Sequence, residues 1–307
     1  MTPRTTHPLR LAVIVAVVAI LGALGATSAG AATPRKASRA TATSTIARVD
    51  RPAAARAMWV WDTSDPASVV TLATSRGIGQ LYAAVPPNVG TSPQLAQLRR
   101  LVELADEAGL RVDALGGDPG WVDNPTWVVN SWLKPALATG LFTGVHVDIE
   151  PYTTSAWTTN RKAVVKRYLS TLDSLRTAAG ATPLEADIPF WYDEVAANGS
   201  TLDRETMRRT SGVTVMAYRN LASGVDGSIA LAANEVRAGS ELGRAVRIGQ
   251  ETNFLGTDPT EVKQTFYGQS LTQMESQLGA ITAAYTGSAS FAGLAVHDAK
   301  GYAALTG

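Results

Sequence analysis

The chain has 307 residues, of which 45% are hydrophobic and 17% charged, and this balance excludes a disordered or fibrous protein. Residues 1–57 hold eight Lys and Arg against one acid, Asp50. Subtracting these from the totals of 27 basic and 26 acidic side chains leaves 19 and 25 for residues 58–307, a net charge of −6. Such a domain is poorly suited to binding phosphate backbones, so nucleic-acid binding is excluded as the main function.

The first 31 residues have the pattern of a secretory signal peptide. Arg4 and Arg10 precede an apolar run at 11–26, and Ala29-Gly30-Ala31 fits the cleavage site. The run is shorter than the roughly 20 residues of a membrane-spanning helix, which leaves an uncleaved anchor as the weaker alternative. A lipoprotein is excluded because no Cys can carry the lipid. We therefore expect cleavage after residue 31 and a secreted, extracellular chain with no stable membrane insertion.

Residues 32–57 are predicted to form a disordered basic leader. The segment is rich in Ala, Thr, Ser and Arg and shows no apolar periodicity. The remaining residues, 58–307, are long enough for one large domain.

Eight short apolar segments alternate with longer amphipathic ones along 58–307. The short segments favour β-branched or aromatic residues and are bounded by Gly, Pro, Asn or Asp, as strands are. The expected strands are 58–61, 80–85, 111–115, 144–150, 183–189, 212–218, 245–251 and 292–298. Helices or broken crossovers are expected at 65–76, 92–108, 126–139, 159–179, 193–211, 228–242 and 270–285. In the second of these, Ser92 is expected to cap the helix and Gly109 to end it.

This alternation predicts a single-domain α/β fold, the closed parallel (β/α)8 TIM barrel. An open doubly wound sheet is the alternative. It is disfavoured because no Gly-rich dinucleotide-binding turn follows an early strand.

The fourth expected strand, GVHVDIE, places acids inside the barrel. Its three apolar residues form the face that packs under the helices, so His146, Asp148 and Glu150 point inwards. Burial and mutual repulsion would raise one carboxyl pKa, as a general acid requires. The alternative is a buried, hydrogen-bonded polar plug without a reaction.

Other strand ends place polar and aromatic side chains at the same mouth, where the chemistry of such barrels lies. Tyr218 and Glu251 join the two acids as candidate catalytic residues. Each aromatic residue taken singly is more often core than ligand platform. The expected substrate-binding residues are Trp61, Asp62, His146, Asp187, Trp191, Tyr192, Arg219, Asn253 and His297.

The residue inventory limits the chemistry. With three His in the whole chain, a zinc site built from several His is not expected, and no GxSxG elbow or Cys nucleophile supports acyl transfer. A hard-cation site from Asp148, Glu150, Glu251 and His297 is a minor alternative. We expect no metal and no cofactor.

Two motifs resemble the chitinase-type glycoside hydrolases of family eighteen. FTGVHVDIEPY (142–152) is similar to the fourth-strand signature of that family, and VMAY (215–218) to its sixth-strand Met-x-Tyr. The resemblance implies that Glu150 protonates the glycosidic oxygen. It also implies that Asp148 and Tyr218 hold the 2-acetamido group, whose oxygen attacks the anomeric carbon in place of a protein nucleophile.

The sequence departs from this family at three places. Its first two motif acids correspond to Thr143 and His146, and the Trp usual near the eighth strand's end is replaced by His297-Asp298.

Two other functions use the same residues. In a retaining glycosidase, Glu150-Pro151 would supply the acid/base and Glu251 the nucleophile, with carboxyl groups about 5–5.5 Å apart. Ile149 stands where such enzymes usually have Asn. In a non-catalytic exported module, the mouth would bind a glycan without cleaving it. Under each hypothesis we expect a monomer whose partner is a poly- or oligosaccharide, with N-acetylhexosamine favoured by the resemblance.

Overall fold

Eight parallel strands form a closed barrel in the order β1-β10-β9-β8-β5-β4-β3-β2. The computed structural model describes residues 55–307, so the expected signal peptide and nearly all of the expected leader lie outside the described residues. The predicted (β/α)8 barrel is confirmed, and the open doubly wound alternative is wrong. The strands are β1 Arg56–Val60, β2 Ile78–Ala84, β3 Arg111–Gly116, β4 Gly144–Val147, β5 Leu184–Pro189, β8 Gly212–Met216, β9 Ala245–Glu251 and β10 Phe291–His297.

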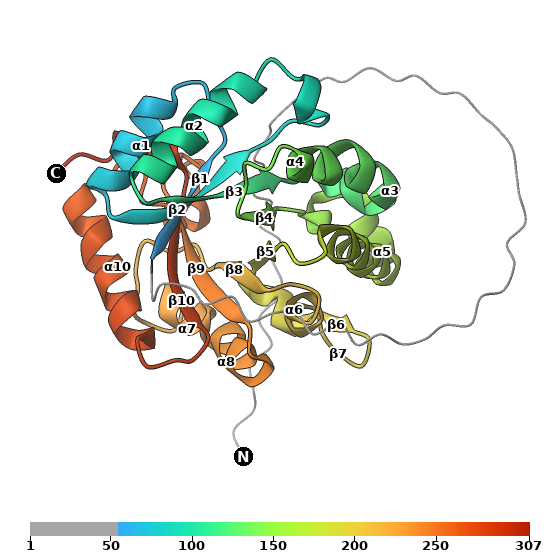
Figure 1. Cartoon of the computed structure of the whole chain (residues 1–307). Helices are drawn as coiled ribbons and strands as arrows, with labels where there is room; N and C mark the ends of the chain where they lie inside the picture. Colours follow the sequence, from blue (N-terminus) through green and yellow to red (C-terminus); the bar gives the residue numbers. More distant parts are fainter. Residues whose placement is uncertain (1–54) are drawn as a thin grey trace, which may run out of the picture.

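Helices surround the barrel (Figure 1). They are α1 Pro66–Ser75, α2 Leu95–Glu107, α3 Pro125–Trp127, α4 Lys134–Ala138, α5 Ser155–Ala179, α6 Leu202–Met207, α7 Ser228–Leu231, α8 Ala233–Leu242, α9 Pro259–Val262, α10 Leu271–Tyr285 and α11 Ala299–Ala304. A π-helical stretch, Val128–Leu133, joins α3 to α4, and a small hairpin, β6 Ala196–Ala197 with β7 Ser200–Thr201, interrupts the fifth crossover. None of the helices in the described part of the chain has the length and apolar character needed to cross a bilayer.

The start of α2 differs from the prediction. Ser92 does not cap the helix, because its hydroxyl accepts a hydrogen bond from the Gln94 N–H in the turn before it, and the helix begins at Leu95. The predicted end is right: Gly109 follows the helix with a φ of +71°, a conformation that glycine adopts without strain.

The barrel begins two residues before the predicted boundary at residue 58. Arg56 and Ala57 belong to β1, which pairs with β2 on one side and β10 on the other. Arg56 also forms an ion pair with Glu275 of α10, 2.7 Å from nitrogen to oxygen. The first strand therefore takes up the last part of the segment expected to be leader.

Strand alternation separates two apolar regions, as the sequence predicted. Val145, Val147 and Ile149 belong to the large core between strands and helices. A second cluster fills the lumen and includes Trp59 and Tyr82. The interior of the barrel thus combines aromatic rings with the buried polar groups that face it.

Polar residues at the N-terminal end of the lumen are paired with one another. Arg247 donates to the side-chain oxygen of Gln80 at 2.8 Å and to the carbonyl of Ala292 at 2.7 Å. Asp113 accepts from the Gln80 amide at 2.6 Å and from the Thr143 hydroxyl at 2.7 Å. This floor network gives a buried Arg and a buried Asp hydrogen-bond partners at the bottom of the barrel.

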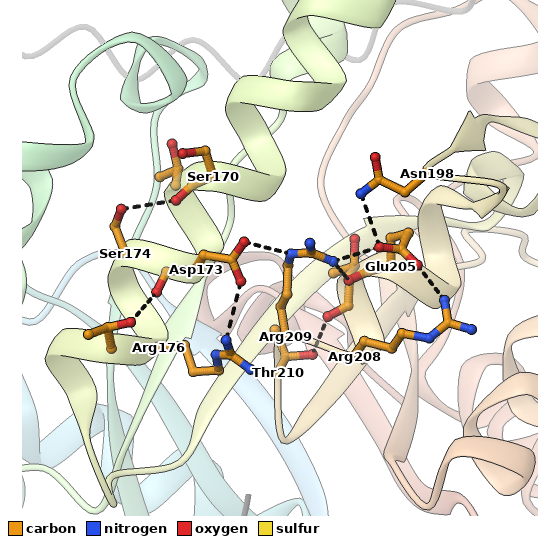
Figure 2. Close-up of polar contacts among 12 residues, drawn as sticks. Ser170, Asp173, Ser174, Arg176, Asn198, Glu205, Arg208, Arg209 and Thr210 are labelled. Carbon is orange, nitrogen blue, oxygen red and sulfur yellow. Dashed lines mark hydrogen bonds and ion pairs between the residues drawn. The ribbon is translucent and has the colours of Figure 1, made fainter. Parts of the chain in front are cut away.

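A second polar network joins α5 to α6 on the outer wall (Figure 2). Arg209 lies between Asp173 and Glu205, with nitrogen-oxygen distances of 3.1 and 2.8 Å. Glu205 also pairs with Arg208 and accepts from Asn198. These contacts fasten the fifth crossover to the long helix before it.

Candidate active site

The two motif acids lie just past the end of β4. That strand ends at Val147, three residues before the predicted boundary, and Asp148 and Glu150 follow it in the loop at the C-terminal mouth. The Asp148 N–H donates to the Gly116 carbonyl at 3.0 Å. A Cβ atom on Gly117 would lie 1.8 Å from the Asp148 carbonyl oxygen, so only glycine at 117 permits this approach.

Three acids influence one another at the mouth. Burial raises the pKa of Asp148 well above its usual range, and the nearby charges of Glu150 and Asp187 raise it further. Burial also raises the pKa values of Glu150 and Asp187, against hydrogen bonds from Tyr152 and Trp59 respectively. One Asp148 oxygen, Oδ1, has no hydrogen-bond partner among the described residues. These shifts favour the protonated form of the carboxyl groups, the form that a proton donor needs.

Tyr152 orients Glu150. Its phenol donates a hydrogen bond to Glu150 Oε1, and its ring meets Trp191 edge-on at 5.2 Å between centroids. The second carboxylate oxygen of Glu150 is left out of this contact, and the side chain is half-buried. Glu150 is therefore held in place while remaining accessible from the mouth.

Asp187 is committed to contacts within the lumen. Its two oxygens meet His146 Nε2 at 2.8 Å and the Trp59 indole N–H at 3.0 Å. The His146 ring stacks on Tyr82 with centroids 3.7 Å apart. The structure thus places His146 and Asp187 in the lumen below the mouth, where both side chains are buried and contact protein groups.

His297 and Glu251 form a second pair beside the acids. The Nδ1 atom of His297 lies 2.8 Å from Glu251 Oε2, and its Nε2 atom lies 2.9 Å from the Trp61 indole nitrogen. An indole N–H can only donate, so Nε2 accepts and Nδ1 carries the proton in this arrangement. Burial opposes a charge on His297, but Glu251 outweighs it and raises the pKa to about 9. Below that pH Nε2 also carries a proton, so the hydrogen bond from Trp61 belongs to the neutral form of the ring.

The Glu251 carboxylate is already occupied. Its Oε1 atom accepts from the backbone N–H groups of Thr252 and Asn253 at 2.8 and 2.7 Å, and from the Asn253 side chain at 3.0 Å. Asn253 also donates to Asp298 at 3.2 Å. With His297 on the other oxygen, Glu251 is arranged to orient its neighbours rather than to attack a substrate.

Tyr218 lies near His297 at the end of the sixth barrel strand, with ring centroids 6.4 Å apart. Strand β8 ends at Met216, two residues before the predicted boundary, so Tyr218 follows the strand. Gly249 makes room for the ring, because a Cβ there would be 3.3 Å from Tyr218 and 3.4 Å from Trp59. Burial raises the pKa of Tyr218 well above 10, so the phenol keeps its proton as a donor.

Four residues expected to bind substrate lie in different surroundings. Tyr192 is fully buried and stacks on Trp157 in the outer core, so it offers no ring face to a ligand. Arg219 turns to Asp226 at 2.8 Å and lies over the Phe190 ring. Asp62 is exposed at the rim and accepts from Ser64, whose hydrogen bonds lower the Asp62 pKa.

Trp191 is half-buried between the rings of Tyr152 and Trp157. It keeps part of its surface beside Glu150. It is the one of these four whose position fits a role next to the two motif acids.

No metal-binding constellation exists within residues 55–307, where no three His, Cys, Asp or Glu side chains could together hold an ion. His297 contacts Glu251, and in the described part of the chain these two residues do not come together with Asp148 and Glu150 as one set of ligands.

Three residues of the site escaped the sequence analysis. Trp59 shares the inward phase of Trp61, and Tyr152 follows Glu150 by two positions, so strand alternation and the end of the DIEPY motif could have indicated both. The third, Gly117, has a role set by a tertiary contact that no local pattern shows.

Comparison with known proteins supports the fold. Neither a protein-family model nor a curated protein matches the sequence. Among solved structures, a variant GH18 chitinase from Cycas revoluta in complex with (GlcNAc)4 is similar, with a TM-score of 0.55 and 11% identity over 81% of this chain and 96% of that one. The spore cortex-lytic enzyme SleL of Bacillus megaterium has a TM-score of 0.52 and 11% identity over 82% and 72%.

A class V chitinase from Nicotiana tobaccum gives a TM-score of 0.44 and 15% identity over 64% of this chain, which spans 66% of that protein. The Cycas revoluta chitinase and SleL thus share the fold of this chain, at low sequence identity.

Proposed function

We propose that the protein is a secreted glycoside hydrolase that cleaves an N-acetylhexosamine-containing polysaccharide. Glu150 acts as general acid, and Asp148 and Tyr218 hold the acetamido group whose oxygen attacks the anomeric carbon. The observation that carries this proposal is the pair of acids at the mouth, Asp148 and Glu150, both with raised pKa values and one held by Tyr152. The fold shared with chitinases and a cortex-lytic enzyme supports the substrate class.

The retaining alternative with Glu251 as nucleophile receives less support. A nucleophilic carboxylate needs a free oxygen facing the anomeric carbon, and both Glu251 oxygens accept hydrogen bonds from the protein. The attack is assigned instead to the substrate, which needs no protein nucleophile.

The decisive experiment compares Glu150→Gln with Glu251→Gln on N-acetylated and non-acetylated oligosaccharides. Glu150→Gln should lower kcat by about 10²–10⁴-fold, the usual contribution of a general acid, while the melting temperature stays unchanged. Only acetylated substrates should react. Cleavage of a non-acetylated sugar that is lost in Glu251→Gln would support the retaining alternative. If the unmodified protein binds these sugars but does not cleave them, the result would support the hypothesis of a non-catalytic binding module.

Secretion is part of the proposal and has its own test. N-terminal sequencing of the extracellular protein should find Ala32 as the first residue. Recovery of an intact residue 1–31 segment in membranes only would contradict it.

A further inference from the structure

A groove lies on the outer wall beside the mouth, away from the proposed catalytic residues. Its volume is about 630 Å³, within the range of small-ligand sites. One wall comes from Asn220 and Leu221 after β8, and the other from Gln269 and the first turns of α10. None of the lining residues carries a charge.

The walls are held in place by hydrogen bonds. Gln277 of α10 accepts from the Ala222 N–H at 2.8 Å, which ties the two walls together. Asn220 donates to the carbonyls of Val262 and Thr265 at 2.9 and 3.1 Å. A ligand would therefore meet a preformed surface and would pay little ordering entropy.

Polar groups in the groove remain available. In the described part of the chain, the side chains of Gln269, Thr272 and Ser276 have no hydrogen-bond partner, and Thr272 and Ser276 are exposed. Their amide and hydroxyl groups donate and accept, as sugar hydroxyls and acetamido groups do.

The helix that forms the groove has an unusual exterior. Between Lys263 and Asp298 the only Asp, Glu, Lys or Arg is Glu275, which pairs with Arg56 and accepts from Tyr302. The exposed side of α10 therefore has hydrogen-bonding groups but few charged side chains. Such a surface suits a neutral ligand better than a nucleotide or an acidic polymer.

Two exposed aromatic rings lie between the groove and the mouth along the chain. Phe254 and Tyr267 are each 57% exposed and meet edge-on at 5.2 Å. Phe254 follows Asn253 of the Glu251 network, and Tyr267 precedes Gly268 of the groove. Exposed rings of this kind provide apolar faces on which sugar rings can stack.

We propose that this groove is an accessory site that binds neutral N-acetylhexosamine units of the polymer outside the cleavage site. The identity of the sugar rests on the proposed function, whereas binding itself does not require turnover. The chain of the polymer would run from the mouth across Phe254 and Tyr267 into the groove. A short oligosaccharide would fill the mouth alone.

The test places the same charge inside and outside the groove. Ser276→Arg fills the groove, whereas Ala283→Arg lies two turns further on the same helix face, about 10 Å away. Both substitutions are made in Glu150→Gln for binding and in the unmodified protein for turnover. Binding to colloidal chitin is measured by depletion from solution, and turnover with a short soluble N-acetylglucosamine oligomer.

Ser276→Arg should weaken chitin binding about tenfold, a loss of about 1.4 kcal/mol, and leave turnover of the short substrate unchanged. Ala283→Arg should change neither, and Gln269→Ala, a milder substitution, should weaken binding in the same direction. Equal binding by the Ser276 and Ala283 variants, or no chitin binding at all, would overturn the groove proposal. Absent turnover of every acetylated sugar would overturn the proposed function alone, because the binding comparison still decides about the groove.

Discussion

Both ends of the barrel interior contain buried charged side chains, but the two sets are arranged differently. At the floor, Arg247 and Asp113 are both hydrogen-bonded to the neutral amide of Gln80, which lies between them. At the mouth, Asp148 and Glu150 face each other and Asp187, and Asp148 Oδ1 has no partner within the described residues. Buried charged groups with hydrogen-bond partners maintain a structure, whereas acids held close together in a buried site have raised pKa values, a feature common at functional sites.

Breaking the floor should cost the most stability. Arg247→Met removes the donor to Gln80 and Ala292, and each buried acceptor left without its hydrogen bond typically costs about 1–3 kcal/mol. Chemical denaturation should show this loss, while kcat per folded molecule stays the same. Arg100→Met, on an exposed part of α2, is the control and should change little. A large loss of kcat with unchanged stability would show that the floor also takes part in catalysis.

Altering the mouth should have the reverse effect. Asp148→Asn should lower kcat about 100-fold, equivalent to about 2.7 kcal/mol of transition-state stabilisation. Burial raises the pKa of Asp148, so the ionised carboxyl destabilises the folded protein. This destabilisation is largest above the raised pKa and disappears as the pH falls. The variant should therefore melt at a higher temperature than the unmodified protein at pH 7. Lower kcat together with lower stability would mean that Asp148 is a structural residue.

An acid outside the mouth tests whether a buried carboxyl without hydrogen-bond partners is by itself a sign of an active site. Glu235 of α8 is fully buried, its oxygens lack hydrogen-bond partners among residues 55–307, and Asp193, Asp203 and Tyr285 are the titratable groups around it. Burial, with Asp193 adding repulsion, raises its pKa to about 9.

Because the folded protein holds this proton and the unfolded chain releases it above about pH 4.5, stability should fall as the pH rises from 4.5 towards 9. Glu235→Gln should flatten this slope, raise stability at pH 8 and leave kcat unchanged. A slope that persists in the variant would assign it to other groups.

The outer network between α5 and α6 should contribute least. Arg209 is half-buried between Asp173 and Glu205 (Figure 2), and pairs of this kind are worth about 1 kcal/mol or less. Arg209→Met should lower the free energy of unfolding by about that amount, and the difference should shrink in 1 M salt. A loss as large as that of Arg247→Met would remove the distinction between the barrel interior and its wall.

Strand alternation carried most of the sequence-based prediction. A period of two fixes which face of a strand is buried, and this placed His146 in the lumen and Val145 under the helices correctly. It could not place residues beyond the strand ends, where the period stops. Tyr192 follows β5 in a 3-10 turn, and that turn directs its ring into the outer core.

Strand alternation also could not predict contacts between residues that are distant in sequence. Glu251 was predicted as a possible nucleophile because Glu150-Pro151 and Glu251, on the fourth and seventh strands, resemble the pair of a retaining glycosidase. Its occupation by His297 depends on a residue 46 positions away on the adjacent strand. Ser92 has a different explanation, because its hydroxyl accepts from Gln94, two residues on, in the turn that precedes the helix.

The pairing of β1 with β10 has a consequence for the order in which the chain folds. Ala57 lies beside Ala295 and Met58 beside Val296, so the barrel joins residues almost at opposite ends of the described chain. During synthesis the ring cannot close until Phe291–His297 has left the ribosome, and until then β1 and β9 both have open edges. Ribosome-bound chains ending at Gly287 should therefore be digested by protease within the barrel, whereas full-length chains resist. The barrel therefore remains open until its last strand has been synthesised.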